Sequence, residues 1–183
     1  MRYLLAIILT ILCSMNVYAE DNNMTDKKIL VAYFSATGTT AKVAERLAKA
    51  TDGDLFEIKP VQAYSNADLD WTDKKSRSSV EMADAGSRPA IASKVEDMSK
   101  YGVVFIGFPI WWYREPSIVD TFMESYDFAG KTVVPFATSG TSGIGDSGQN
   151  LQALAPKAKV LKGARFSSDV SEEELKDWAQ EQL

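Results

Sequence analysis

The sequence has 183 residues, which is enough for one domain with a sizeable core. It carries 20 basic and 25 acidic residues, and the resulting net charge of −5 argues against general binding to nucleic acids. Histidine is absent and Cys13 is the only cysteine. The rest of the chain therefore cannot build a Ser-His-Asp or Cys-His nucleophilic system, a Cys/His zinc site or an iron–sulfur centre. Any redox chemistry has to come from a bound cofactor.

The first 19 residues have the pattern of a secretory signal peptide. Arg2 lies near the start, an apolar stretch covers residues 4–13, and the segment ends with small residues. The apolar stretch is shorter than the ~20 residues that cross a bilayer. We therefore expect residues 1–19 to be removed, residues 20–27 to form a disordered linker, and residues 28–183 to form one domain. The protein is then exported, to the periplasm or the extracellular space, with no stable membrane span.

Residues 28–47 predict a strand, a turn and a helix. The run Ile29–Phe34 is continuously apolar, as in a strand that is buried on both faces of a parallel sheet. The turn from Ser35 to Thr40 carries four hydroxyl groups and one glycine, and apolar side chains then recur at helical spacing. Free N–H groups at the start of a helix favour an anion, so this turn is a candidate phosphate site. The alternative is that its Ser and Thr residues simply cap the helix.

The region after the first helix carries weaker signals. Residues 54–59 alternate apolar and charged side chains, which predicts an edge strand. The charged, Ser-rich region that follows predicts a helix over residues 70–83 within a long crossover. Two aromatic residues of this region, Tyr64 and Trp71, are expected to patch the core rather than to cover a ligand.

Residues 101–109 predict a second buried strand, and a cluster of aromatic residues follows it. Trp111, Trp112 and Tyr113 are adjacent, and three neighbouring aromatic side chains cannot all enter one core. We therefore expect at least one ring to lie at the carboxyl edge of the sheet. Pro116 then opens a helix, because proline is well tolerated in a first helical turn.

The C-terminal third continues the alternation of strands and helices. A strand is predicted over residues 131–137, although Pro135 costs a ladder hydrogen bond there. A second loop of glycine and hydroxyl residues, 138–145, follows this strand. The remaining predicted elements are a helix over residues 146–154, a strand over residues 160–166 and a last helix that begins with the capping box of Ser171 and Glu174.

This alternation predicts an α/β fold, a three-layer doubly wound sandwich around a five-stranded parallel sheet. Ligands of such sheets bind at the carboxyl ends of the strands. Three special loops leave strands at that edge: the first offers anion donors, the second flat aromatic faces and the third a glycine-rich backbone. Together they predict a ligand with a phosphate and a planar heteroaromatic ring. Two nearby acidic residues, Glu115 and Asp146, are interpreted as surface charges or as partners of helix N-termini.

The same loops resemble those of the flavodoxins. Residues 35–40, Ser-Ala-Thr-Gly-Thr-Thr, match the flavodoxin phosphate loop at every fixed position, and the Gly-Phe-Pro-Ile-Trp-Trp run and the Thr-Ser-Gly loop look like the two loops that flank the flavin. The resemblance covers residues 28–183 and implies the strand order 2-1-3-4-5 and a non-covalently bound FMN. No catalytic side chain and no metal ligand is assigned. The implied cofactor-binding residues are Ser35, Thr37, Gly38, Thr39, Thr40, Pro109, Ile110, Trp111, Trp112, Tyr113, Thr138, Ser139, Gly140 and Gly143.

Three hypotheses of function follow. The leading one is an exported FMN-binding, flavodoxin-like protein that transfers electrons to or from a redox partner protein or a small-molecule donor or acceptor. The second is an FMN-dependent NAD(P)H or quinone reductase, which the long region 64–98 would suit as a lid. The third is a flavin-free extracytoplasmic binding module on the same fold, because a fold does not fix a function.

Overall fold

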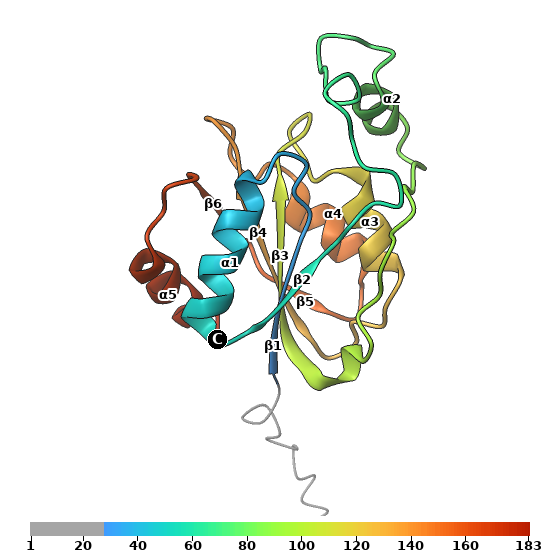
Figure 1. The fold of residues 1–183 in the computed structure, drawn as a ribbon. Coiled ribbons are helices and arrows are strands. Elements are labelled where there is room, and N and C mark those ends of the chain that lie inside the picture. The colour runs from blue at the N-terminus through green and yellow to red at the C-terminus, as the bar shows by residue number, and fades with distance from the viewer. Residues whose placement is uncertain (1–27) are drawn as a thin grey trace, which may run out of the picture.

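The structure is a computed structural model, and it describes residues 28–183. Its strands are β1 (Lys28–Tyr33), β2 (Asp54–Glu57), β3 (Tyr101–Pro109), β4 (Thr132–Thr138), β5 (Lys159–Val160) and β6 (Ala164–Phe166). They form one parallel sheet in the order β2-β1-β3-β4-β5, with β6 also paired to β4. Helices lie on both faces of the sheet, so the predicted three-layer fold and its strand order are confirmed (Figure 1).

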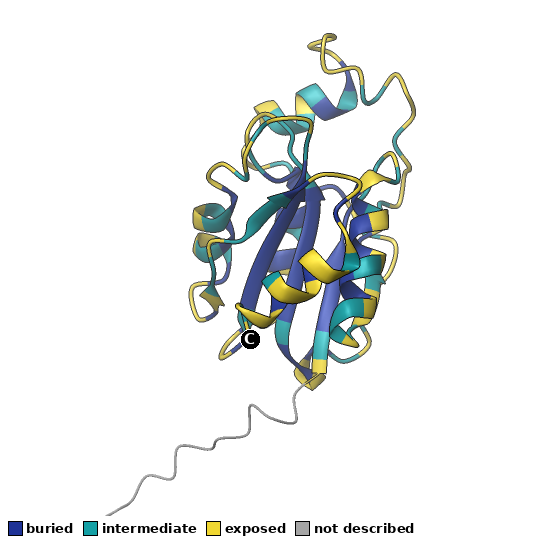
Figure 2. Cartoon of the chain, turned by 90° about the vertical axis from the view of Figure 1, so that its left-hand side faces the viewer, coloured by how far each residue is buried: buried dark blue, intermediate teal, exposed yellow. Residues whose placement is uncertain are grey.

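The three central strands are buried because their apolar runs face a helical layer on each side. Val31, Phe105 and Val134 stand side by side across β1, β3 and β4, and all three are fully buried. Figure 2 shows these strands as the buried centre between two partly exposed helical layers. Burial of this kind is the main favourable term in folding, at about 25 cal/mol per Å² of apolar surface. It fixes the sheet and thereby the loops at its carboxyl edge.

The helices divide between the two faces of the sheet. On one face lie α1 (Thr39–Thr51) and α5 (Glu172–Gln180), and on the other lie α3 (Ser117–Glu124) and α4 (Ser147–Leu154) (Figure 1). The predicted cap of the last helix is present, because the Glu174 N–H donates to Ser171 Oγ at 3.0 Å. Pro116 is the N-cap of α3 and lies just before its first turn.

The prediction of one strand over residues 160–166 is wrong, and Pro135 explains why. The carbonyl oxygens of Lys131 and Val133 in and before β4 accept hydrogen bonds from the N–H groups of Lys159 and Leu161. Every second residue of a strand points its backbone groups to the same neighbouring strand, so the backbone of Pro135 faces the outer strand as well. Proline has no N–H to donate there. The outer strand is therefore interrupted, and Gly163, with a φ of 72°, passes Pro135 so closely that a Cβ would lie 2.1 Å from the proline oxygen. Towards β3 the pairing of β4 is continuous.

The helix predicted over residues 70–83 is shorter than expected, since α2 covers only Arg77–Ala83. Asp70 Oδ1 accepts from the Thr72 N–H at 2.9 Å, and Asp73 Oδ1 accepts from the Lys75 N–H at 2.8 Å. Such local side-chain bonds compete with the helical ladder and keep these residues in turns. The segment between β2 and β3 rises beyond the carboxyl edge of the sheet and carries α2 there, away from both helical layers (Figure 1).

The predicted signal peptide, residues 1–19, and the predicted linker, residues 20–27, lie outside the described residues. Within residues 28–183, no helix has the length and apolar character that a membrane span requires.

Candidate functional site

The hydroxyl turn after β1 leaves the start of α1 accessible. Gly38 has a φ of 84°, in the left-handed region that glycine favours, and a Cβ at this position would touch none of the described residues within 4 Å. The chain enters α1 at Thr39. The first N–H groups of a helix lack partners within the helix and carry partial positive charge. The turn therefore presents backbone donors that suit an anion.

Three hydroxyl groups of this turn are arranged for a ligand. Thr37 and Thr39 are exposed, and their Oγ1 atoms lie 3.5 Å apart. Ser35 Oγ is buried and has no hydrogen-bond partner in the described part of the chain. An unsatisfied buried hydroxyl costs ~1–3 kcal/mol. A phosphate at the turn would remove that cost, so the donor set fits the predicted group.

The side chain of Thr40 connects two loops. It is buried, and its Oγ1 lies 2.8 Å from Oγ1 of Thr138, which ends β4. The two residues are 98 positions apart in the sequence. This pair holds the hydroxyl turn against the loop that follows β4.

The residues after β3 form a tight turn, Trp111 to Arg114, called here the aromatic turn. The Trp111 N–H donates to the Arg114 oxygen at 3.0 Å, and the Arg114 N–H donates to the Trp111 oxygen at 3.1 Å. Trp112 and Tyr113 have φ values of 45° and 67°, which matches the positive φ that both central residues of a type I′ turn require. Bulky residues rarely adopt this conformation, and it costs ~1–3 kcal/mol for each. Strain of this kind is typical of functional sites.

As predicted, the three aromatic side chains of this turn do not all enter one core. The Trp111 ring packs edge to face, with its centroid 5.6 Å from that of Phe34 and 5.4 Å from that of Tyr64. Trp112 and Tyr113 remain 44% and 77% exposed. The turn thus anchors one ring in the core and presents two rings at the edge of the sheet.

The glycine-rich loop after β4 packs directly on the aromatic turn. Gly145 has a φ of 60°, and a Cβ there would lie 2.0 Å from the carbonyl oxygen of Tyr113. The Ile110 N–H donates to the Thr138 oxygen at 3.1 Å, so the two loops are also joined where their strands end. Gly143 is exposed, and the space around its Cβ position is open among the described residues. Only a residue without a side chain allows the backbones to meet at Gly145.

The three loops, together with residues of the segment 165–168 at the end of β6, line a cavity of about 460 Å³, called here the cradle. Its volume falls within the range of small-molecule sites, about 300–1,000 Å³. Ser35, Gly38, Thr40 and Gly143 are outside its lining, and Trp112 and Tyr113 line a separate neighbouring cavity. The cradle is lined by Thr37, Thr39, Pro109, Ile110, Trp111, Thr138, Ser139, Gly140, Arg165, Ser167 and Ser168.

Three residues of the cradle lining were missed from the sequence: Arg165, Ser167 and Ser168. The Arg165 guanidinium donates from Nη2 to the Ser139 oxygen at 2.7 Å and also to the Gly140 oxygen, so it braces the glycine-rich loop. The hydroxyl turn itself has no cation, but the cradle does. The sequence did contain a signal for the two serines. They follow the last strand directly, just as the hydroxyl, aromatic and glycine-rich residues follow the three strands whose loops were predicted to bind the ligand.

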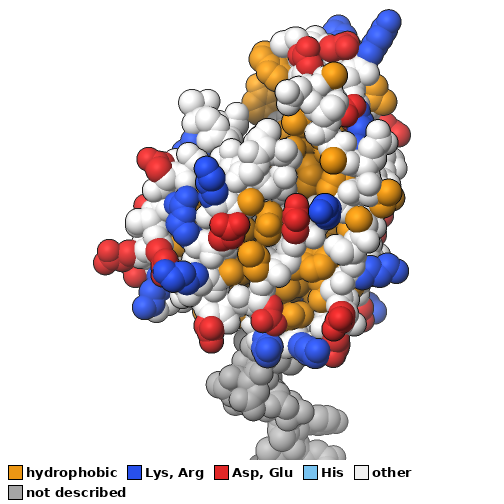
Figure 3. Space-filling view, in the orientation of Figure 1, with side chains coloured by type: hydrophobic (Ala, Val, Ile, Leu, Met, Phe, Trp, Pro, Cys, Tyr) orange, Lys and Arg blue, Asp and Glu red, His pale blue; other side chains and the backbone are white. Residues whose placement is uncertain are grey.

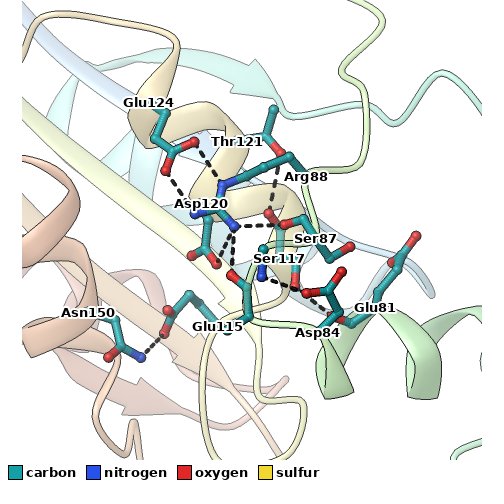
Figure 4. Close-up of polar contacts among 12 residues, drawn as sticks. Glu81, Asp84, Ser87, Arg88, Glu115, Ser117, Asp120, Thr121, Glu124 and Asn150 are labelled. Atoms are coloured by element: carbon teal, nitrogen blue, oxygen red, sulfur yellow. Dashed lines mark hydrogen bonds and ion pairs between the residues drawn. The ribbon is translucent and has the colours of Figure 1, made fainter.

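A charge network surrounds Glu115 and Asp120 at the start of α3 (Figure 4). Arg114 contacts Glu115 at 3.5 Å and donates to Asp120 Oδ2, and Asp120 also lies 3.8 Å from Arg88. Burial raises the pKa of Asp120 to about 7, Arg114 and Arg88 oppose this shift, and Glu115 adds to it. The network fixes the end of the aromatic turn to the start of α3.

The interpretation of Glu115 as a surface charge is wrong, because its side chain is fully buried. Its position next to the N-cap of α3 places it between Arg114 and α4, where Asn150 Nδ2 donates to Glu115 Oε2 at 3.4 Å. Asp146 is exposed and is the N-cap of α4, in agreement with its interpretation.

The fold and the three loops define a doubly wound α/β protein with a candidate cofactor site at the carboxyl edge of its sheet. The flavodoxin family model matches residues 28–182, so the chain belongs to the flavodoxin family. The family assignment predicted from the sequence is thereby confirmed. A comparison with curated proteins finds no significant match.

Solved structures agree with this assignment. A protein from Bacteroides eggerthii DSM 20697, provisionally described as a flavoprotein, is 52% identical, with a TM-score of 0.80 over 85% of this chain and 97% of that chain. A protein from Bacteroides uniformis ATCC 8492 with the same description is also 52% identical, with a TM-score of 0.80 over 84% and 98%. A flavoprotein from Lactobacillus acidophilus NCFM in complex with FMN is 24% identical, with a TM-score of 0.60 over 84% and 99%, and shows the fold alone.

Proposed function

We propose that this chain is an exported FMN-binding protein that transfers electrons. The observation that carries the proposal is the fit of the site to FMN. The hydroxyl turn offers open helix N–H groups and a buried Ser35 hydroxyl that has no partner among residues 28–183, and Thr37 and Thr39 of this turn line a cavity of about 460 Å³ with an aromatic wall. Membership of the flavodoxin family supports the same cofactor. FMN supplies reversible uptake of one or two electrons when it is bound.

The residues of the chain then have three tasks. Ser35, Thr37 and Thr39, with the backbone at Gly38, hold the phosphate without a cation in the turn itself. Ile110 and Trp111 supply an apolar wall for the ring. The glycine-rich loop, braced by Arg165, closes the opposite side and offers backbone groups to the polar edge of the ring.

Export belongs to the proposal as well. Its support is the sequence pattern of residues 1–19, which would direct the protein to the periplasm or the extracellular space. N-terminal sequencing of the protein recovered from the periplasmic fraction of expressing cells is expected to give Glu20 as the first residue. Recovery of the full chain from the cytosol would contradict this part.

A specific observation also favours a second candidate, an FMN-dependent reductase of NAD(P)H or a quinone. The segment between β2 and β3 helps to form a second cavity that shares Ile110 and Trp111 with the cradle. An electron carrier that docks only with another protein has no need of such a cavity. Steady turnover of NADPH with a quinone by the loaded protein would support this candidate, and its absence with all tested pairs would exclude it.

The test of the cofactor site uses a titration with FMN and with riboflavin, followed by flavin fluorescence. FMN is expected to bind tightly and riboflavin weakly, because only FMN carries the phosphate. Thr37→Val and Thr39→Val each remove a hydrogen bond to a charged group, worth about 1.5–3 kcal/mol, so the Kd for FMN should rise about 10- to 150-fold.

The matched control is Thr132→Val at the opposite end of the sheet, where the same substitution is expected to leave FMN affinity unchanged. Thr37 and Thr39 are exposed, so their replacement should not disturb folding. Equal affinity of the protein for FMN and riboflavin would contradict the phosphate site. Failure to bind either would remove the redox proposals.

A further inference from the structure

A second cavity of about 390 Å³ lies beside the cradle, between the segment that carries α2 and the aromatic turn. Four of its lining residues are aromatic: Trp71, Trp111, Trp112 and Tyr113. Its volume is within the range of small-molecule sites. Figure 3 shows hydrophobic side chains at the surface of the lobe that carries α2 and between this lobe and the sheet below.

Trp71 does not patch the core, contrary to the prediction from the sequence. Its side chain is 75% exposed, whereas Tyr64, the other aromatic residue considered with it, packs against Phe34 and Trp111 as expected. An exposed tryptophan leaves a large apolar surface in water. Together with Trp112 and Tyr113, it places three exposed aromatic residues around one cavity. Their convergence from two distant segments indicates a ligand site rather than a random surface.

The walls of the cavity are held in place. On one side, Tyr64 donates to Glu81 Oε2 at 2.5 Å, and the Arg77 guanidinium lies 3.9 Å from the Tyr64 ring centroid, so the segment with Trp71 is tied to the core. On the other side, the aromatic turn is fixed by its own hydrogen bonds and by the contact with Gly145. A preformed site of this kind binds with a small entropic cost.

The chemistry of the lining selects the ligand. None of the described residues that line the cavity is charged, and the polar groups are hydroxyls of Ser78, Ser142 and Tyr113 and the indole N–H groups. A charged ligand would lose its hydration without gaining a counter-charge. A flat neutral ring stacks favourably on aromatic side chains, and hydroxyl and N–H donors suit carbonyl oxygens at its edge.

We propose that this cavity, bordered by Trp71, Trp112 and Tyr113, is a second ligand site that binds a neutral planar ring bearing carbonyl oxygens, as in a quinone. The inference rests on the proposed function in one respect: Ile110 and Trp111 line both cavities, so a ring bound here lies against the wall of the FMN cradle. Binding in the second cavity does not itself require FMN.

Isothermal titration with naphthoquinone tests this site in the protein with and without FMN. Residues 28–183 contain no cysteine that would react covalently with the quinone. The expected result is binding in both forms. Naphthoquinone sulfonate, which has the same ring with a negative charge, should bind at least tenfold more weakly because the lining offers no cation.

Variants locate the binding. Trp71→Ala should raise the Kd for naphthoquinone at least tenfold, while Trp71→Phe, which keeps a flat ring, should raise it less than threefold. Val80→Ala is the matched control, because Val80 lies in the same segment, is 54% exposed and does not line the cavity. The exposure of Trp71 means that these variants should fold, and circular dichroism checks this.

Four results would overturn the inference: no binding of naphthoquinone, no effect of Trp71→Ala, equal binding of the sulfonate, or loss of naphthoquinone binding when FMN is present. The last would assign the cavity to the cofactor itself. The experiment distinguishes failure of this inference from failure of the proposed FMN-binding function. Naphthoquinone binding by a protein that ignores FMN would refute the proposed function alone, and FMN binding without naphthoquinone binding would refute this inference alone.

Discussion

Replacing Gly145 with alanine tests whether a missing side chain lets the aromatic turn and the glycine-rich loop form one wall. The new Cβ would lie 2.0 Å from the Tyr113 oxygen, whereas Cβ contacts under 3.0 Å are essentially never seen, so one loop has to move by about 1 Å. The left-handed φ adds about 1–2 kcal/mol for alanine. Relief of the clash adds roughly 1–3 kcal/mol, the usual cost of overpacking. We expect the free energy of unfolding to fall by about 2–5 kcal/mol.

The assay is urea unfolding followed by circular dichroism, together with a titration with FMN. The displaced wall should weaken FMN binding about tenfold or more, since tenfold corresponds to about 1.4 kcal/mol. Gly143→Ala is the matched control: it lies in the same loop, and its added methyl group meets none of the described residues within 4 Å. The reasoning is refuted if the two variants behave alike, or if Gly145→Ala retains the stability and FMN affinity of the parent.

Three further predictions concern the supports of the site. Thr40→Val leaves Thr138 without its partner at 2.8 Å and should cost about 1–3 kcal/mol, while adding Thr138→Val should restore part of that loss; additive losses in urea unfolding would disprove the coupling. Tyr64→Ala removes a partly buried ring from Phe34 and Trp111 and should cost about 3 kcal/mol by the same measurement, against less than 0.5 kcal/mol for the exposed Val61→Ala. Asp120 binds its proton up to about pH 7 in the folded protein but only to about pH 4 when unfolded, so its contribution to stability decreases as pH rises from about 4 to 7. Asp120→Asn should make stability less dependent on pH in that window, and an unchanged dependence would show that Asp120 does not cause it.

The sheet and the three loops of the cradle could be predicted because their signals are local. Buried parallel strands are continuous apolar runs, and the residues that follow such strands meet at one edge whatever the details of packing. The hydroxyl turn, the aromatic turn and the glycine-rich loop were each visible in a few consecutive residues. The position of the proposed cofactor site could therefore be predicted without knowledge of any contact between distant residues.

Features that depend on contacts between distant residues could not be predicted. Glu115 looks like a surface acid in the sequence and is buried because Arg114 and Asn150 meet it there. Trp71 is exposed because the Asx turns at Asp70 and Asp73 replace the first part of the expected helix, and within residues 28–183 no core lies next to this segment. Arg165 joins the cradle through a strand whose interruption depends on Pro135 in its neighbour.

The interruption at Pro135 also affects how copies of the protein meet one another. An open sheet has two outer strands whose free backbone groups can pair with another chain and start aggregation. One border of this sheet consists of the short strands β5 and β6, of two and three residues, with Gly163 in the break between them. The other border is the four-residue β2, which begins and ends with an acidic residue. Neither border offers a long, flat template. The same proline that complicates the sheet thus protects the protein from intermolecular strand pairing at high concentration.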